Sequence, residues 1–72
     1  MDEKNPSVSE QTKLQLAAAL KTLMAQKPMD KITIAELTSI CNIRRQSFYY
    51  HFEDIYDLLR WMIENEAISL LR

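Results

Sequence analysis

Hydrophobic residues along the chain recur every three or four positions, which is the spacing of a buried face on an α-helix. The first run shares one helical face with a neighbouring alanine and consists of Leu16, Leu20, Leu23, Met24 and Ala19. This run predicts a first helix that begins at Ser7, whose spacing to Glu10 matches a capping box. The helix should end near Gln26, because Lys27 precedes a proline and is disfavoured in the helical conformation.

The pattern next predicts a short second helix with a well-defined start. Thr33 and Glu36 have capping-box spacing, and the apolar residues Ile32 and Leu37 occupy the positions of a hydrophobic staple around the cap. The apolar face of this helix comprises Ile34, Leu37 and Cys41. We expect the helix to end at Asn42, because asparagine tolerates the left-handed backbone that a tight turn between helices needs.

Two more helices complete the pattern. A third is expected from about Arg44 to His51, with its apolar contacts at Ile43, Phe48 and Phe52. Asp54 should cap a fourth helix, and Asp57 lies in its first turn, where negative charge interacts favourably with the helix dipole. The main apolar stripe of the fourth helix is Ile55, Leu58, Leu59 and Met62. Trp61, Ile68 and Leu71 lie around its other faces, which indicates a second surface to bury.

These elements predict an all-α fold, a homeodomain-like three-helix helix-turn-helix bundle followed by the start of a fourth helix. The absence of glycine and the hydrophobic content of 47% agree with a helical globular chain. Residues 1–8 would form a flexible arm, residues 9–53 the helix-turn-helix domain, and residues 54–72 the fourth helix. We expect the fourth helix to lead into a C-terminal regulatory domain that lies outside these 72 residues.

The net charge of −1 argues against nucleic-acid binding, but the charges are unevenly distributed. The segment from Leu37 to Phe52 contains Arg44, Arg45 and His51 and no acid. The acids that follow it are Glu53, Asp54, Asp57, Glu64 and Glu66. Either the split is chance, or it separates a surface for DNA from the rest of the domain. Clustering of the three basic residues with Lys27 or Lys31 on one face would favour DNA.

A helix-turn-helix places its second helix in the major groove of DNA. The third predicted helix offers hydrogen-bonding side chains suited to that task, namely Arg45, Gln46, Ser47, Tyr49, Tyr50 and His51. Arginine can pair with a guanine edge and glutamine with an adenine edge. Hydroxyls and an imidazole N–H suit phosphate oxygens. The alternatives are that the tyrosines are packing residues and that Arg44 and Arg45 are merely a solvated face.

The stretch Asn42-Ile43-Arg44-Arg45-Gln46-Ser47-Phe48-Tyr49-Tyr50-His51-Phe52 resembles the signature of the TetR family of bacterial regulators. That family typically shows Gly-Val-Ser-Lys-x-Thr-Leu-Tyr-x-His-Phe there, and the Tyr-x-His-Phe ending is the specific part. The likeness extends from about Thr12 to Leu59. The continuation through Leu59 and Trp61 is also similar to a subgroup that includes regulators of dihydroxyacetone kinase operons.

The resemblance implies a role for each matching residue. Arg45, Gln46 and Tyr49 would face base edges, while Ser47, Tyr50 and His51 would hold phosphates. Thr33 would add a phosphate contact from the second helix, and Arg44 is a further candidate DNA contact. The family also implies a homodimer that reads a palindromic operator, and an effector bound by the C-terminal domain.

Three positions depart from the family pattern. Asn42 replaces the usual turn glycine. Arg44 replaces a serine or threonine that usually caps the recognition helix, so this cap should be weaker. Ile55 stands where many members carry a lysine that touches a phosphate, so the grip on DNA should be lighter and less sensitive to salt.

Other function classes have little support in the sequence. Catalysis would need Ser47 or Cys41 to act with His51, and no orienting acid or oxyanion loop accompanies them. One histidine and one cysteine fall short of a zinc site, so we expect neither a metal nor a cofactor. Cys41 should pack in the core. No apolar run approaches the ~20 residues of a membrane span, and a cytoplasmic location is expected. The rival hypothesis is a helical protein-interaction module without DNA binding.

Overall fold

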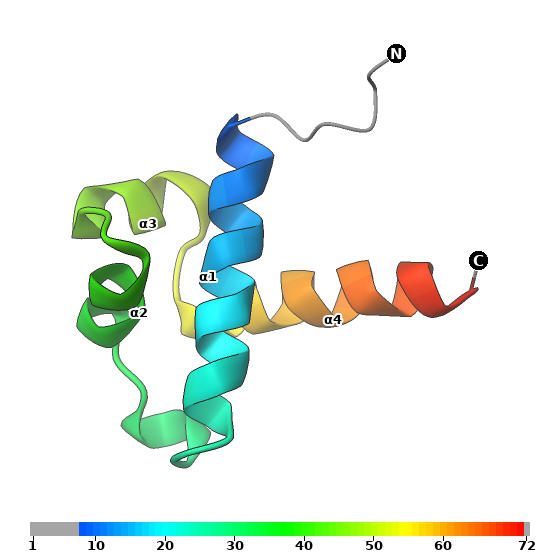
Figure 1. The fold of residues 1–72 in the computed structure, drawn as a ribbon, viewed down its shortest axis with the longest axis horizontal. Coiled ribbons are helices and arrows are strands. Elements are labelled where there is room, and N and C mark those ends of the chain that lie inside the picture. Colours follow the sequence, from blue (N-terminus) through cyan, green and yellow to red (C-terminus); the bar gives the residue numbers. More distant parts are fainter. Residues whose placement is uncertain (1–7, 72) are drawn as a thin grey trace.

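The fold is entirely helical over the described part of the chain. The computed structural model describes the backbone of residues 8–71 and the side chains of residues 8–66. Its elements are the helices α1 (Val8–Met24), α2 (Ile34–Cys41), α3 (Arg45–His51) and α4 (Ile55–Leu71), with a short 3-10 helix, η1 (Met29–Lys31), before α2 (Figure 1). The predicted all-α class is confirmed.

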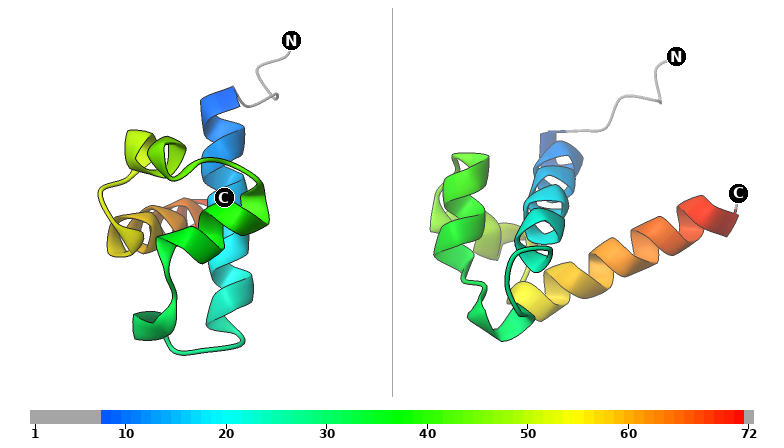
Figure 2. Two further views of the ribbon diagram at one scale, coloured as in Figure 1. Left: turned by 90° about the vertical axis from the view of Figure 1, so that its left-hand side faces the viewer. Right: turned by 60° about the horizontal axis from the view of Figure 1, so that its bottom comes forward.

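Helix α1 is the centre of the arrangement. It packs against α2 on one side and α4 on the other, and α2 packs against α3. Figure 1 shows α2 and α3 together on one side of α1, while α4 crosses α1 and runs outward on the other side. The right-hand view in Figure 2 shows the same separation of α3 from the free end of α4. The α2–α3 pair is therefore held by α1 at a distance from the last turns of α4.

The core draws on every one of the four α-helices. Its buried hydrophobic residues are Leu16, Ala17, Ala19, Leu20, Leu23, Ile32, Leu37, Phe48, Phe52, Leu58 and Met62. Around it lie the half-buried Met29, Ile34, Cys41, Ile43, Ile55, Leu59 and Trp61. Complete burial of a large apolar side chain stabilises a fold by about 1.5–3 kcal/mol. Phe48 has no exposed surface, so it is among the main contributors.

The first helix differs from the prediction in two details. It ends at Met24 rather than near Gln26, although the amides of Gln26 and Lys27 still bond to the Leu23 carbonyl at 2.9 Å. Met24 was wrongly expected in the core and is 40% exposed. Successive helical residues are rotated by about 100°, so Leu23 turns inward and Met24 turns away. The predicted Ser7 cap lies outside the described residues.

The start of α2 has the expected capping box. The Glu36 amide donates to the Thr33 hydroxyl at 3.2 Å, and the Thr33 amide donates to a Glu36 carboxylate oxygen at 3.0 Å. The same carboxylate pairs with Lys27, and these contacts hold the pKa of Glu36 below its ordinary value, with the Lys27 hydrogen bond as the largest cause. Ile32 and Leu37 are both buried, as the staple requires.

The turn between α2 and α3 depends on Asn42. This residue has φ 57° and ψ 45°, and it is the only non-glycine residue with positive φ in the part of the chain that the structure describes. Its amide donates to Ser39, and the following amide of Ile43 donates to Thr38 at 3.0 Å. Asparagine thus performs the role expected of it, and the chain reverses into α3 without a glycine.

The Asn42 turn yields a stability prediction. Asn42→Ala should lower the free energy of unfolding by about 1–2 kcal/mol, because a β-carbon without a compensating polar group is unfavourable in the left-handed region. Asn42→Gly is the matched control and should change it by less than about 0.5 kcal/mol. Urea unfolding followed by circular dichroism measures both. Equal destabilisation by alanine and glycine would show that the side chain, not its backbone angle, matters here.

Candidate nucleic-acid interface

Helix α3 presents one face to the core and the other to solvent. Phe48 is completely buried, and its ring packs edge-on against Tyr49 at 5.6 Å and beside Phe52 at 5.9 Å. Phe52 in turn meets Trp61 of α4 at 6.0 Å. The apolar anchors expected at Phe48 and Phe52 are confirmed, and they fix the rotation of α3 about its own axis.

That rotation leaves the predicted base-reading side chains in solvent. Arg45 and Gln46 are exposed, Tyr49 is 53% exposed and Tyr50 is 83% exposed. Ser47 and His51 are half-buried. Neither tyrosine is a core residue, but Tyr49 also packs edge-on against Phe48, so a packing role remains an alternative for Tyr49 and is disfavoured for Tyr50. The structure brings all these side chains together because they share one short helix.

Arg44 and Thr33 flank this face in different ways. Arg44 is exposed and stands in the N-cap position of α3, but its side chain makes no capping hydrogen bond, as its replacement of a serine or threonine predicted. Thr33 begins α2, at the opposite end of that helix from the turn into α3. Its hydroxyl is engaged by Glu36, both as acceptor from the amide and at 3.4 Å from the carboxylate. A phosphate contact by Thr33 would have to share that hydroxyl.

The surroundings of His51 were not anticipated from the sequence. The Ser9 hydroxyl of α1 lies 3.4 Å from His51 Nδ1, which joins positions 42 residues apart. Partial burial lowers the pKa of His51 below its ordinary value of 6.5, and the positive charge of Lys13, also on α1, lowers it further. Lys13 rests over the Trp61 ring at 5.7 Å from its centroid. No local pattern joins the first helix to the third, so this cluster requires the tertiary fold to be seen.

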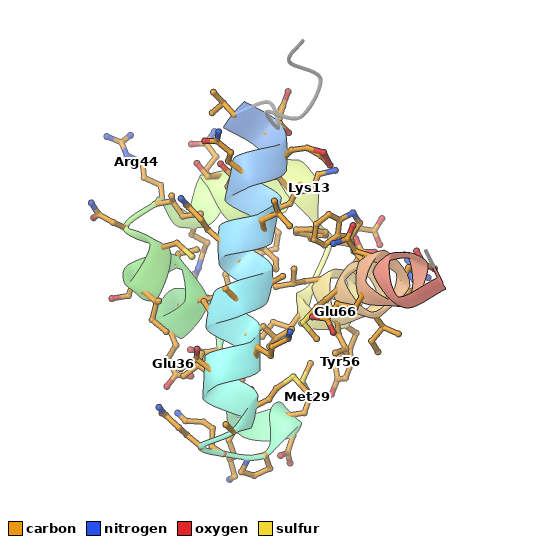
Figure 3. The ribbon with its side chains drawn as sticks, turned by 45° about the vertical axis from the view of Figure 1, so that its right-hand side comes forward. Lys13, Met29, Glu36, Arg44, Tyr56 and Glu66 are labelled. Atoms are coloured by element: carbon orange, nitrogen blue, oxygen red, sulfur yellow. The ribbon has the colours of Figure 1, made fainter. Side chains whose placement is uncertain are left out.

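The basic cluster differs from the one the sequence suggested. Lys27 is paired with Glu36, and η1, which carries Lys31, lies at the end of α1 remote from α3 (Figure 1). Lys27 and Lys31 therefore do not cluster with the basic residues of α3, so the observation that would have favoured DNA is not made for these two lysines. Figure 3 shows instead Arg44 and Lys13 on opposite sides of the N-terminal half of α1. Lys13 thus supplies the additional positive charge at the His51 end of α3.

The start of α4 is acidic, and its own carboxylates accept hydrogen bonds from the backbone amides there. The Asp57 amide donates to Asp54 at 2.8 Å, as the predicted cap requires, and the Glu53 amide donates to Asp57 at 3.0 Å. The Glu53 bond, followed by the Arg60 pair, holds the pKa of Asp57 below its ordinary value. Carboxylates already occupy these two amides, so this helix start is poorly suited to a phosphate.

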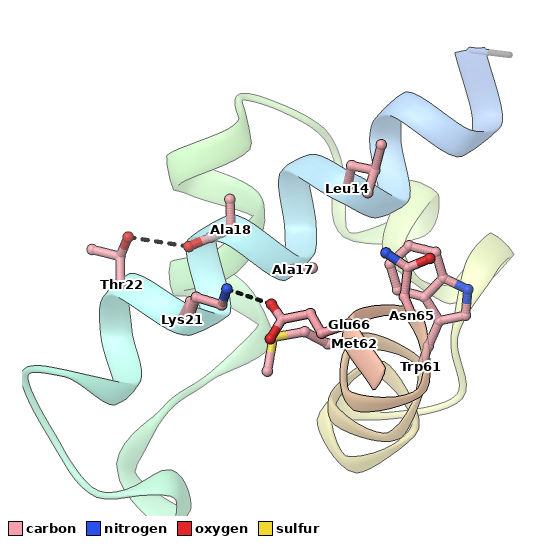
Figure 4. Close-up of a pocket in the computed structure, with 9 residues that line it drawn as sticks. All are labelled: Leu14, Ala17, Ala18, Lys21, Thr22, Trp61, Met62, Asn65 and Glu66. Atoms are coloured by element: carbon pink, nitrogen blue, oxygen red, sulfur yellow. Dashed lines mark hydrogen bonds and ion pairs between the residues drawn. The ribbon is translucent and has the colours of Figure 1, made fainter. Parts of the chain in front are cut away.

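A groove on the described surface lies away from α3. It runs between α1 and α4, encloses about 460 Å³, and is bordered by Ala17, Ala18 and Leu14 on one side and Trp61, Met62 and Asn65 on the other (Figure 4). The Lys21–Glu66 ion pair crosses it. This groove is the feature that most favours a protein-interaction surface.

Other chemistry is thinly represented among the described residues. Cys41 is half-buried rather than fully buried, and burial raises the pKa of its thiol, which keeps it protonated and a poor nucleophile. Ser9, not Ser47, is the hydroxyl recorded at His51 Nδ1. The described residues contain no group of three or more metal-ligating side chains. None of the described helices is both long and apolar enough to span a bilayer.

Comparison with known proteins is consistent with this geometry. Residues 16–62 match the family of bacterial regulatory proteins named for tetR. Over 56 residues the chain is 34% identical to a protein of Lactococcus lactis described as an HTH-type dhaKLM operon transcriptional activator, DhaS. That alignment covers 78% of this chain but 30% of the relative, so the chain spans less than a third of that protein's length.

The surroundings of His51 give a pH prediction. The ring should titrate with a midpoint below 6.5, because burial and Lys13 both disfavour the imidazolium. Lys13→Gln removes one of those causes and should move the midpoint upward, though not past the ordinary value, since burial remains. Lys31→Gln is the control and should leave it unchanged. NMR of the His51 ring protons measures the midpoint in the parent chain and in both variants. The titration covers about pH 5–8, the range in which histidine titrates.

This prediction can fail in two ways. A midpoint at or above the ordinary value in the parent chain would show that burial does not govern the ring. An unchanged midpoint in Lys13→Gln would show that Lys13 is too distant to act on it.

Proposed function

The chain belongs to the tetR family of bacterial regulatory proteins, and on that premise we propose that it binds double-stranded DNA sequence-specifically, with α3 in the major groove. The observation that carries the proposal is the solvent-facing side of α3. It combines side chains able to read bases with a buried face that fixes their direction. A major groove about 12 Å wide admits one α-helix, and every residue of α3 except the buried Phe48 carries a hydrogen-bond donor.

Base reading falls to Arg45, Gln46 and Tyr49 in this proposal. All three side chains are exposed, so they reach a base edge without any rearrangement of the core. A guanidinium can make two hydrogen bonds to guanine, and a carboxamide can make two to adenine. The buried Phe48 between them sets their register relative to the helix axis.

In this proposal the contacts to the phosphate backbone of DNA are made by Tyr50, Ser47 and His51. Tyr50 is the most exposed of these side chains, at 83%. His51 lies at the last turn of α3, where its ring stacks edge-on with Tyr50 at 5.1 Å. Arg44 adds a charge at the opposite end of α3, and Thr33 a hydroxyl at the start of α2. Contacts at both ends of a recognition helix fix its register on the duplex without reading sequence.

The net charge of the domain affects its affinity for DNA more than the way in which α3 recognises the bases. With a net charge of −1, the domain as a whole gains little from the phosphate field. The basic residues at α3 and the adjoining part of α1 are Arg44, Arg45 and Lys13, and Glu53, Asp54 and Asp57 follow at the start of α4. The other described basic residues lie elsewhere, namely Lys21, Lys27, Lys31 and Arg60. We expect modest affinity for a single domain and a shallow salt dependence.

We propose that dimerisation and effector binding, in a protein as long as the relative, belong to a part of the protein outside these 72 residues. The relative is more than three times as long as the aligned part, and it is described as a transcriptional activator. We propose that residues 9–53 form the DNA-binding unit and that α4 joins it to a C-terminal domain. That domain would form a cytoplasmic homodimer, place two α3 helices on a palindromic operator and bind an effector.

A second candidate function is protein binding without DNA. The groove between α1 and α4 and the negative net charge favour it. The two functions use different surfaces, because the groove residues lie on α1 and α4 and the proposed DNA readers lie on α3. Substitutions on α3 therefore discriminate between them.

Selection from a random-sequence duplex library, followed by fluorescence anisotropy on the selected duplex, tests the proposal. Arg45→Ala should cost about 1–3 kcal/mol and relax preference at one base pair. His51→Ala should weaken selected and scrambled duplexes by the same factor, because phosphates are the same in both. Lys31→Ala is the control and should have little effect. If no sequence is enriched, the proposed function is wrong. If both α3 variants change specificity in the same way, the assignment of roles is wrong.

A further inference from the structure

The end of α3 and the start of α1 form one surface, and it carries charge that the recognition helix alone does not. Resting on the DNA-binding function proposed above, we infer that Lys13 of α1 and His51 of α3 together grip a single DNA phosphate, with Ser9 orienting the ring. Lys13 thus becomes a DNA contact outside the helix-turn-helix.

The orientation of the His51 ring supports this inference. When the Ser9 hydroxyl donates to Nδ1 at 3.4 Å, the neutral ring carries its proton on Nε2. Nε2–H is then the donor left for an outside acceptor. His51 is half-buried, so its ring is supported by neighbours on one side and accessible on the other. The edge-on contact with Tyr50 further limits rotation of the ring.

The position of Lys13 supports it as well. Its ammonium lies over Trp61, whose ring packs on Phe52, the residue directly after His51. The lysine is therefore held beside the end of α3. A half-buried stem that ends in a held charge loses less conformational freedom on binding an anion than a free surface lysine does. Lys13 makes no ion pair among those recorded for the described residues.

The charges and donors of Lys13 and His51 favour an anion between the two side chains. Lys13 is positively charged and the neutral His51 ring offers an N–H donor, so an anion placed between them interacts favourably with both. A phosphate oxygen has the charge and the acceptor geometry for both an ammonium and an imidazole N–H. The alternative anchor, the start of α4, has its Asp57 and Glu53 amides bound to carboxylates. The α1–α3 junction is therefore the better phosphate site on this side of the domain.

A proton-linked effect follows from the same arrangement. The groups that face His51 are Ser9 and Lys13 from α1, Tyr50 beside it and Phe52 after it, with the acids Glu53 and Asp54 next along the chain. In the free domain, burial and Lys13 lower the pKa of His51. A phosphate at the ring would raise it, so binding would take up a proton and strengthen as the pH falls from 8 toward 6 (about the range in which histidine titrates).

Salt-dependent anisotropy on the selected duplex tests the inference. Lys13→Gln should reduce the slope of log K against log salt concentration by about 1, the loss of one phosphate contact. Lys13→Arg should retain the parent slope because it keeps the charge. Lys21→Gln, on the same helix but paired with Glu66, and Lys31→Gln should also retain it. His51→Gln should remove most of the tightening between pH 8 and pH 6, whereas Lys31→Gln should keep it.

The outcomes separate this inference from the function on which it rests. If Lys13→Gln binds with the parent slope while Arg45→Ala still loses specificity, DNA binding stands and the Lys13 contact is wrong. If Lys13→Gln and Lys13→Arg lose slope equally, the lysine acts by packing on Trp61 and not as a phosphate ligand. If the parent chain enriches no duplex, the proposed function itself is wrong. Thermal melts of each variant exclude loss of fold as the cause.

Discussion

The complete burial of Phe48 is the interaction on which the rest of the structure depends. Helix α3 spans only Arg45–His51, and so short a helix is not stable in water by itself. It exists because Phe48 and Phe52 pack into a core shared with α1, α2 and α4. The same contact decides which side of α3 faces solvent, and with it which side chains are free to meet a duplex. Stability and recognition are thus set by one buried ring.

Helix α1 transmits that constraint to the whole domain. It packs on both α2 and α4, and its first turns reach the end of α3 through Ser9. The Lys13–Trp61 contact and the Lys21–Glu66 pair tie it to α4 at two levels. The charged groups near α3 therefore include residues that are remote from it in the sequence.

How much the sequence could predict depended on the range of each interaction. Thr33, Asn42 and Asp54 act within a few residues of their partners, so their roles in capping and turning were predicted and are confirmed. The core at Leu16, Leu20, Phe48 and Leu58 follows from helical periodicity and is confirmed too. Met24 was wrongly predicted in the core, because it follows the buried Leu23 by one residue and is rotated away from the core by about 100°. The pairing of Lys13 with the His51 site was missed, since only tertiary packing brings α1 beside the end of α3. The contacts to DNA assigned to α3 stay predictions.

The central claim is that α3, supported at its end by α1, is the surface that meets DNA. Titration of the nitrogen-15-labelled chain with the selected duplex, followed by backbone amide NMR, tests it most directly. The account predicts that the largest shifts fall on Arg45–His51, on Arg44 and on Ser9 and Lys13, with small changes along the α1–α4 groove. Shifts centred on Ala17, Trp61 and Met62 with α3 unchanged, or no shifts at low salt, would contradict it.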